Sequence, residues 1–212
     1  MDPEQARAKL DAARLYLVTD GRDGGEELHA FLDAVLGAGV DVIQLREKEL
    51  EAGPILARAE IFREACNRYD VPFIVNDRAD LAFAAEADGV HLGQDDLPVE
   101  AARRLLGRSM MIGRSTHDPD QVSSAEAEDV DYVAVGPVHE TPTKPGRPAA
   151  GIGLLPVAAA TLTKPWFAIG GIDGSNLAAV RDAGASRIVV VRAVTQAGDP
   201  AAVVKALREK LI

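Results

Sequence analysis

The sequence contains little cysteine and few aromatic residues. Cys66 is the only cysteine among 212 residues, so the chain cannot form an intramolecular disulfide. It lies in a segment with helical periodicity, 54–69, where a small buried apolar residue is a better interpretation than a nucleophile. Because only 4% of the residues are aromatic while 47% are hydrophobic, the core must be built mainly from Val, Ile, Leu and Ala.

Long apolar runs and an excess of basic residues are also missing. No segment approaches the roughly 18 consecutive apolar residues that a membrane span needs, and no apolar segment follows the acidic N-terminus as in a signal peptide. The net charge of −10 argues against a general nucleic-acid or membrane-surface binder, which would carry a basic face. We therefore expect a cytoplasmic protein, with no nucleic acid and no membrane among its partners.

Short β-branched runs alternate with longer amphipathic segments along the chain. In the longer segments apolar residues recur at three-to-four spacing, as at Leu28, Phe31, Leu32 and Val35, which predicts helices. The expected strands are 15–19, 42–45, 73–76, 89–92, 111–115, 132–135, 167–169 and 187–191. The expected helices are 26–38, 54–69, 79–87, 99–106, 119–128, 154–161, 176–183 and 201–211.

Eight such strand–helix units in a chain of about this length are the number expected of a closed (β/α)8 barrel. The strands are apolar nearly throughout, which is typical of parallel strands buried on both faces. A doubly wound open sheet is the alternative, but it commonly uses fewer strands. No linker, shift of composition or charge block marks a boundary, so we predict an α/β protein with a single TIM-barrel catalytic domain, residues 1–212.

Three polar side chains lie at the end of the second expected strand. Because the side chains of a strand alternate between its faces, Gln44, Arg46 and Lys48 project to one side together. An amide, a guanidinium and an ammonium group on one face favour a multiply charged anion. In barrels of this kind the active site lies at the carboxyl ends of the strands, so these residues are candidates for binding a phosphate group.

Carboxylates follow the third and fourth expected strands, at Asp77 and Asp96. Mg²⁺ prefers few carboxylates, keeps several waters and takes further oxygens from a phosphate ligand. With Arg46, Lys48 and Lys144 converging on the same rim, we favour a Mg²⁺ site at these two acids. Taken alone, each acid is also explained as a helix N-cap or a solvated loop residue, and the acids and cations could instead pair with one another.

Smaller groups lie at other strand ends. Gly170 and Gly171 let a ligand approach the backbone closely and predict a phosphate site with the residues after the eighth strand, although a plain tight turn is the alternative. Ser115 has no evident neighbouring base, so we interpret it as a hydrogen-bond donor to a phosphate group and not as a nucleophile. The four histidines match no transition-metal spacing. We interpret His91 as packed inside the barrel, and His117 as a ligand contact or a helix cap.

Taken together and in this order, the polar segments resemble those of the thiamine phosphate synthase (thiamine-phosphate pyrophosphorylase) family. The resemblance extends from Tyr16 to Val191. It rests on Gln44-Leu45-Arg46-Glu47-Lys48, Val75-Asn76-Asp77-Arg78, the segment from Gly89 to Asp96, Gly113-Arg114-Ser115-Thr116-His117, Gly136-Pro137, Thr141-Pro142-Thr143-Lys144 and Ile169-Gly170-Gly171-Ile172. It implies a TIM-barrel transferase that uses Mg²⁺, and since members commonly form oligomers, a homo-oligomer is expected by analogy.

The resemblance also implies a role for each matching residue. The pyrimidine diphosphate substrate would be bound by Gln44, Arg46, Lys48, Asn76, Ser115 and Lys144. The candidate catalytic residues, which would act on the leaving diphosphate, are Arg46, Lys48, Ser115 and Lys144. Mg²⁺ would be held by Asp77 and Asp96. The thiazole phosphate would be bound by Thr141, Pro142, Thr143, Gly171, Val191 and Arg192. The family often has a serine at the position of Arg192, so the role of this arginine stays open.

The implied reaction joins 4-amino-5-hydroxymethyl-2-methylpyrimidine diphosphate to 4-methyl-5-(2-phosphoethyl)thiazole, or to its carboxylated form, and gives thiamine phosphate and pyrophosphate. A dissociative substitution fits such a site, because cations stabilise the departing pyrophosphate and no protein base is needed. A thiazole tautomerase of the same barrel family is one alternative, but it would not need the cations after the second strand or the two acids. A non-catalytic barrel that binds thiamine precursors is the alternative from another class.

Overall fold

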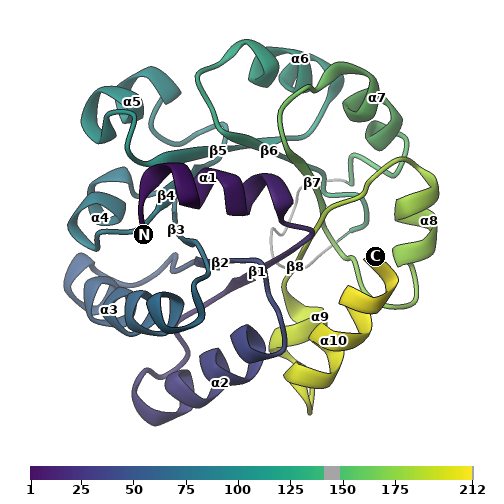
Figure 1. Cartoon of the computed structure of the whole chain (residues 1–212). Coiled ribbons are helices and arrows are strands. Elements are labelled where there is room, and N and C mark those ends of the chain that lie inside the picture. The colour runs from purple at the N-terminus through teal and green to yellow at the C-terminus, as the bar shows by residue number, and fades with distance from the viewer. Residues whose placement is uncertain (141–148, 212) are drawn as a thin grey trace.

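The computed structural model describes residues 1–140 and 149–211. Within these residues, eight parallel strands close into a barrel in sequence order, with helices around the outside (Figure 1). The strands are β1 (Leu15–Thr19), β2 (Val42–Leu45), β3 (Phe73–Asn76), β4 (Gly89–Leu92), β5 (Met111–Thr116), β6 (Tyr132–Val135), β7 (Trp166–Ile169) and β8 (Ile188–Val190). Because β1 pairs with both β2 and β8, the predicted (β/α)8 fold is confirmed.

The helices expected from periodicity lie on the outside of the barrel. They are α2 (Gly25–Gly37), α3 (Ala52–Tyr69), α4 (Ala79–Ala84), α5 (Val99–Leu106), α6 (Pro119–Ala127), α7 (Leu154–Thr161), α8 (Leu177–Asp182) and α10 (Pro200–Leu211). α4 ends earlier than predicted, because Glu86 adopts a left-handed backbone conformation with φ 51°. In the part of the chain that the structure describes, no helix combines the length and apolar character needed to cross a membrane.

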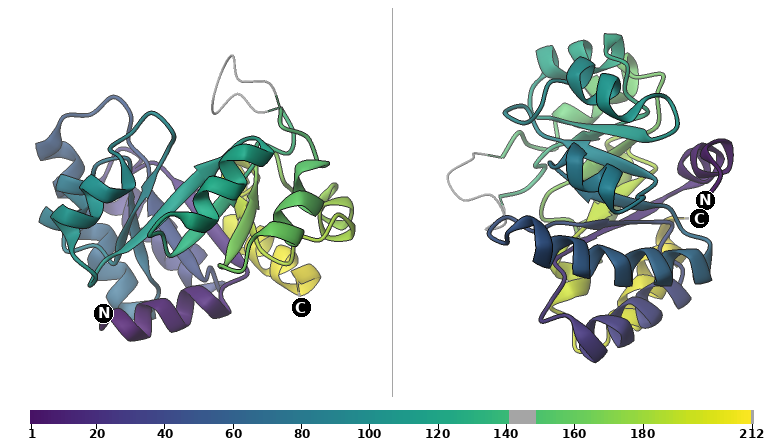
Figure 2. Two further views of the ribbon diagram at one scale, coloured as in Figure 1. Left: turned by 90° about the horizontal axis from the view of Figure 1, so that it is seen from above. Right: turned by 90° about the vertical axis from the view of Figure 1, so that its left-hand side faces the viewer.

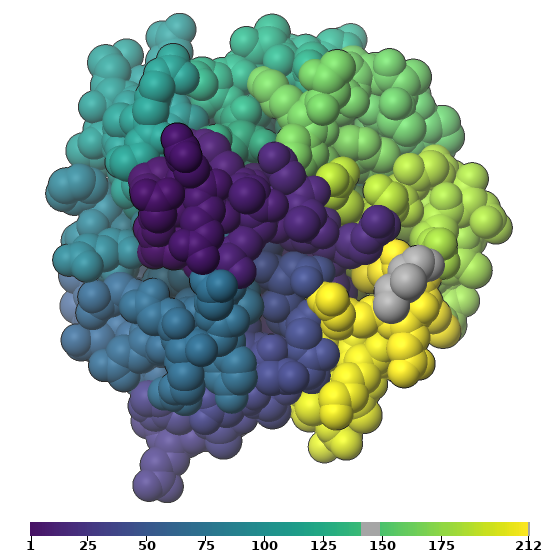
Figure 3. Space-filling model, in the orientation of Figure 1, coloured from purple at the N-terminus to yellow at the C-terminus, as the bar shows by residue number. Residues whose placement is uncertain are grey.

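Two helices lie outside the sequence-based expectation, α1 (Pro3–Ala12) and α9 (Arg192–Thr195). α1 begins after Asp2, whose carboxylate accepts hydrogen bonds from two backbone N–H groups of the first turn. Its Ala6 and Leu10 are buried against side chains that fill the inside of the barrel. Figures 1 and 3 show α1 lying across the centre of one face of the molecule. α1 therefore closes the amino-terminal end of the barrel.

Three aspartates tie neighbouring strands together at this closed end. Asp41, Asp88 and Asp131 each stand directly before an even-numbered strand. Each carboxylate accepts a hydrogen bond from a backbone N–H at the start of the preceding odd-numbered strand, over 2.9, 2.8 and 2.8 Å respectively. Because these bonds fix where each strand begins, they also fix the level at which the carboxyl ends of the strands meet.

The opposite end of the barrel is the one that holds the predicted site residues. In both views of Figure 2, α1 and the end of α10 lie at the same end of the barrel. The strands run away from that end, and their register brings Asn76 opposite His91 and Ser115 opposite Ala134 near the other end. Polar side chains from separate strands are therefore gathered at one level around the barrel axis.

Candidate active site

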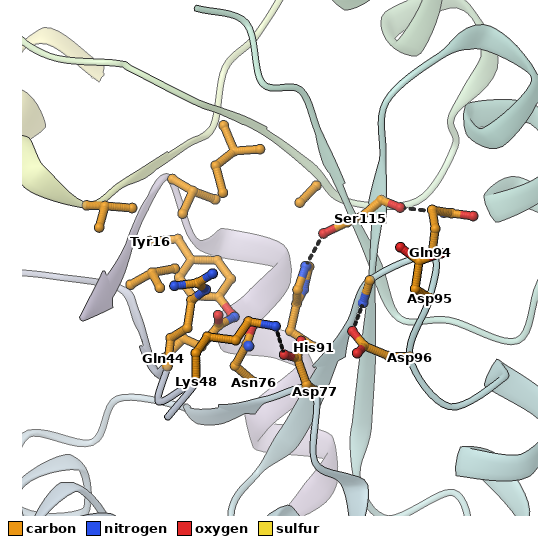
Figure 4. A pocket seen from close by; sticks show the side chains of 17 residues that line it. Tyr16, Gln44, Lys48, Asn76, Asp77, His91, Gln94, Asp95, Asp96 and Ser115 are labelled. Carbon is orange, nitrogen blue, oxygen red and sulfur yellow. Dashed lines mark hydrogen bonds and ion pairs between the residues drawn. The ribbon is translucent and has the colours of Figure 1, made fainter. Parts of the chain in front are cut away.

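Two adjoining cavities lie at the carboxyl ends of the strands. The larger has a volume of about 480 Å³ and the smaller about 320 Å³, which is the size range of small-molecule sites. Both are lined by Ser115, Ile169, Val189 and Val191, so the two cavities meet. Figure 4 shows the larger one, whose labelled polar side chains are Tyr16, Gln44, Lys48, Asn76, Asp77, His91, Gln94, Asp95, Asp96 and Ser115.

The end of β2 carries the predicted polar set into the larger cavity. Gln44, Arg46 and Lys48 all line it, as the alternation of side chains predicts. Glu47, which lies between the two cations, points the other way and accepts a hydrogen bond of 2.7 Å from the backbone N–H of Gly21. This contact ties the end of β2 to the loop after β1 and fixes the orientation of the cations.

Two side-chain groups in this cavity have no partner among the residues that the structure describes. Arg46 lines the cavity, and its guanidinium makes no hydrogen bond or ion pair with any residue that the structure describes. The side-chain nitrogen of Asn76, whose residue is only 8% exposed, likewise has no hydrogen-bond partner within the described ranges. Because buried polar groups are normally paired, a polar or anionic ligand is the natural partner of both.

The two predicted metal ligands face each other across the cavity rim. Asp77 follows β3 in a left-handed conformation, φ 61°, and its backbone N–H donates to the carbonyl of His91 over 2.8 Å. Lys48 forms an ion pair with the Asp77 carboxylate. Asp96 turns back onto its own loop, where Oδ2 accepts a 2.6 Å hydrogen bond from the backbone N–H of Gly93.

Burial is the main cause that raises the pKa of Asp77 above its ordinary value. The facing carboxylate of Asp96 raises the pKa further, while Lys48 acts in the opposite direction. Two carboxylates that resist each other's ionisation favour a cation nearby. Within residues 1–140 and 149–211 no three acidic, histidine or cysteine side chains form a metal cluster. The pair therefore fits Mg²⁺, which takes its remaining oxygens from water and phosphate.

We expect the Asp77→Asn variant to be more stable than the native protein at pH 7 in the absence of Mg²⁺. A carboxyl whose pKa is raised by folding binds more protons in the folded state, so stability falls as the pH rises above its ordinary value of about 3.9. Asparagine removes this loss and tolerates the left-handed conformation. Thermal unfolding of both proteins between pH 3.5 and 8 checks the prediction. A less stable variant at pH 7 would contradict it.

The loop that carries Asp96 is anchored from behind by Arg114. This arginine is 8% exposed, and its guanidinium donates to the carbonyl of Gly93 over 2.6 Å and to the side chain of Gln94 over 3.3 Å. It also pairs with Glu128 at 3.3 Å. The position of the carboxylate is thus set by a buried charge that itself lies outside the cavity.

Sequence reasoning missed several residues of the larger cavity. Tyr16 and Gln94 line it, and His91, which was interpreted only as packed in the barrel, is buried but also lines the cavity and contacts Ser115. The signal for His91 and Tyr16 was the alternation within their strands, which places both on the inside of the barrel. His117 lines the smaller cavity.

The smaller cavity is built by the ends of β7 and β8. Gly170 has a φ of 109°, and a Cβ atom there would lie 2.4 Å from Cβ of Pro137, so only glycine fits this close approach. Gly171, Val191 and Arg192, which the sequence analysis assigned to the thiazole phosphate, all line this cavity. The other predicted residues of the two sites, Thr141, Pro142, Thr143 and Lys144, lie outside the described residues.

A closed parallel barrel with cations and paired acids around a cavity at its carboxyl end is typical of an enzyme that acts on an anionic ligand. The family model described as thiamine monophosphate synthase matches residues 15–194. The chain therefore belongs to the thiamine monophosphate synthase family, and it is an enzyme of the transferase class, as the sequence analysis predicted.

Individual relatives agree with this assignment. The chain is 55% identical to a thiamine-phosphate synthase of Mycobacterium bovis, over 96% of this chain and 97% of the relative. It is 56% identical to the enzyme of the same name from Acidothermus cellulolyticus, over 92% and 93% of the two chains. A thiamine phosphate pyrophosphorylase structure from Pyrococcus furiosus has 31% identity and a TM-score of 0.85, and covers 97% of this chain and 96% of that one.

Proposed function

We propose that the protein is a Mg²⁺-dependent thiamine phosphate synthase. It joins 4-amino-5-hydroxymethyl-2-methylpyrimidine diphosphate to 4-methyl-5-(2-phosphoethyl)thiazole, or its carboxylated form, and releases thiamine phosphate and pyrophosphate. One observation carries the proposal: the amide, the two cations and the two facing acids after β2, β3 and β4 line a single cavity that meets a second one at Ser115. Two cavities in contact suit a reaction between two substrates.

The diphosphate of the first substrate lies among the cations of the larger cavity. Arg46 is available to bind it, because its guanidinium pairs with none of the described side chains, and it matches phosphate oxygens in two-point contacts. Lys48 pairs with Asp77 in this structure, and a Mg²⁺ ion held by Asp77 would leave the ammonium group of Lys48 to bind the diphosphate. Ser115 and Lys144 supply further donors. The pyrimidine ring lies deeper, beside Gln44 and Asn76.

Breaking the bond between carbon and the diphosphate oxygen is the difficult step. Negative charge accumulates on the leaving pyrophosphate while the pyrimidine methylene becomes cationic. Bound Mg²⁺ supplies positive charge to the leaving group, and Asp77 and Asp96 are the residues that would hold it. Arg46, Lys48 and Lys144 stabilise the same charge, and one preorganised contact of this kind is worth about 3–4 kcal/mol in the transition state. The thiazole nitrogen, held in the adjoining cavity, then attacks the cation.

Arg192 provides a test of the smaller cavity as the thiazole phosphate site. Because this exposed arginine lines that cavity, we expect Arg192→Ala to raise the KM for the thiazole phosphate by about tenfold, the value of one charged hydrogen bond. The KM for the pyrimidine diphosphate should change little. Arg104→Ala is the matched control, since Arg104 is an exposed arginine on α5 that lines neither cavity. Equal effects of both variants would contradict the assignment.

The proposed reaction is tested by measuring pyrophosphate release from the pyrimidine diphosphate and Mg²⁺, with and without the thiazole phosphate. We expect release only with both substrates, and one thiamine phosphate formed for each pyrophosphate. Isomerisation of the thiazole phosphate without pyrophosphate release would instead identify a tautomerase. Tight binding of either substrate without any turnover would identify a binding barrel.

A further inference from the structure

Five side chains from five strands form one continuous line of hydrogen bonds beside the larger cavity. Gln44 donates through Nε2 to the hydroxyl of Tyr16 over 2.7 Å, and this hydroxyl lies 2.8 Å from that of Tyr132. The Tyr132 hydroxyl lies 3.1 Å from Nδ1 of His91, and Nε2 of His91 lies 2.8 Å from Oγ of Ser115. Figure 4 shows the His91–Ser115 end of the line directed into the cavity.

All five residues of the line are buried, although Tyr16, Gln44, His91 and Ser115 also border the larger cavity. Both tyrosines are almost fully buried, and the other three residues are between 3% and 7% exposed. Burial raises the pKa of Tyr16 and of Tyr132, so both hydroxyls stay protonated. Each hydroxyl therefore has one hydrogen to donate and no bulk water to receive it. The direction of the line, meaning which group donates to which, then follows from the donors and acceptors along it.

Gln44 sets this direction at one end. Its N–H occupies a lone pair of the Tyr16 hydroxyl, and among the described residues the acceptor in reach of the Tyr16 hydrogen is Tyr132. Tyr132 must then donate to Nδ1 of His91. With the amide as it stands, the reverse order would leave the Tyr16 hydrogen without an acceptor, which buried polar groups avoid.

We propose that in this line Nδ1 of His91 accepts a hydrogen bond from Tyr132 and Nε2 carries a proton, so that His91 donates to Oγ of Ser115 and the serine hydrogen is directed at an anionic ligand in the cavity. His91 and Tyr132 are thus positioning residues for Ser115. The opposite direction would make the serine donate to the histidine, as in a serine nucleophile. The effect on turnover rests on the proposed function, whereas the direction of the hydrogen bonds does not.

The backbone makes room for this line at Gly113. A Cβ atom at this position would lie 2.1 Å from Cζ and 2.4 Å from the hydroxyl oxygen of Tyr132. Gly113 stands opposite His91 in the pairing of β4 with β5. The glycine therefore allows the Tyr132 hydroxyl to reach the inside of the barrel at the level of the histidine.

The direction is tested directly by ¹⁵N NMR of the imidazole rings in the ligand-free native protein at pH 8. The signals of His91 are identified by their absence in His91→Gln. We expect a protonated Nε2 and an unprotonated Nδ1. A ring protonated on Nδ1, or on both nitrogens, overturns the proposal. Since no substrate is present, this outcome does not depend on which reaction the enzyme catalyses.

Two matched variants test whether Tyr132 determines which ring nitrogen of His91 carries the proton. Tyr132→Phe and Tyr16→Phe each remove one hydroxyl from the same buried cluster. Tyr132→Phe removes the donor to Nδ1, so we expect the His91 proton to distribute between the two ring nitrogens. Tyr16→Phe leaves the Tyr132 hydroxyl able to donate, so the Nε2-protonated form should persist. Identical histidine spectra in the two folded variants would overturn the assignment.

Turnover measurements then test whether the positioning of Ser115 by His91 and Tyr132 contributes to the reaction. We expect Tyr132→Phe and His91→Asn to lower kcat about tenfold, the value of one hydrogen bond to a charged ligand, with a smaller change in KM. His91→Gln should retain more activity, because glutamine keeps an N–H near the position of Nε2. An unchanged kcat in folded Tyr132→Phe would overturn the positioning role. Failure of the native protein to turn over, with the expected ¹⁵N spectrum, would instead refute the proposed function alone.

Discussion

Replacing Asp96 with asparagine is expected to lower kcat by about 10²–10³-fold at saturating Mg²⁺, the loss typical of one electrostatic contact to a transition state. Asparagine keeps a side-chain oxygen that can accept the hydrogen bond from the backbone of Gly93, so the loop should keep its shape. The variant loses the negative charge that faces Asp77. Steady-state kinetics over a range of Mg²⁺ concentrations measure the effect.

Asp80→Asn is the control for the Asp96 substitution. Asp80 lies on α4 after Asp77, pairs with Arg78 at 2.6 Å, and lines neither cavity. The Asp80→Asn substitution makes the same change of charge near the same rim. We expect it to change kcat by less than about twofold, because exposed ion pairs are weak. Native activity of the folded Asp96→Asn variant at saturating Mg²⁺ would refute the metal assignment.

Removing the guanidinium of Arg46 is expected to have the second large effect. Arg46→Ala should lower kcat by about 10²–10³-fold, because the leaving diphosphate loses a preorganised cation. Arg46→Lys should lose less, since it keeps the charge but not the two-point contact. Pyrophosphate carries the charges of the leaving diphosphate group. Its inhibition constant as a product should therefore rise more in Arg46→Ala than in Arg46→Lys. Initial rates and product inhibition by pyrophosphate measure both effects.

Arg192→Ala is the comparison for this second prediction, because Arg192 lines only the smaller cavity. The inhibition constant of pyrophosphate should therefore be unaffected in that variant. If pyrophosphate bound more weakly to Arg192→Ala but normally to Arg46→Ala, our assignment of the diphosphate to the larger cavity would be wrong.

The fold could be predicted because it is encoded in local patterns. Each strand is a short apolar run and each predicted helix has its own apolar stripe, as on α2, and eight such units allow few architectures. α1 was missed because its sequence is largely polar, and the apolar surface that it covers comes from strands distant in the chain. Asp2 and Pro3 carried the start signal of this helix, but its docking depends on tertiary packing.

The site could be predicted where it follows from alternation along one strand. Gln44, Arg46 and Lys48 required only the direction in which a strand side chain points. The bonds from His91 to Tyr132 and from Tyr132 to Tyr16 join residues 41 and 116 positions apart, so no local pattern contains them. The left-handed conformation of Asp77 likewise depends on its contact with the carbonyl of His91.

A crystal structure of the protein with thiamine phosphate, pyrophosphate and Mg²⁺ tests the central claim most directly. Our account predicts pyrophosphate in the larger cavity in contact with Arg46 and Lys48, a metal ion bound by Asp77 and Asp96, and the thiazole phosphate in the smaller cavity near Gly171. Pyrophosphate in the smaller cavity, or products bound with both acids away from any metal ion, would contradict it.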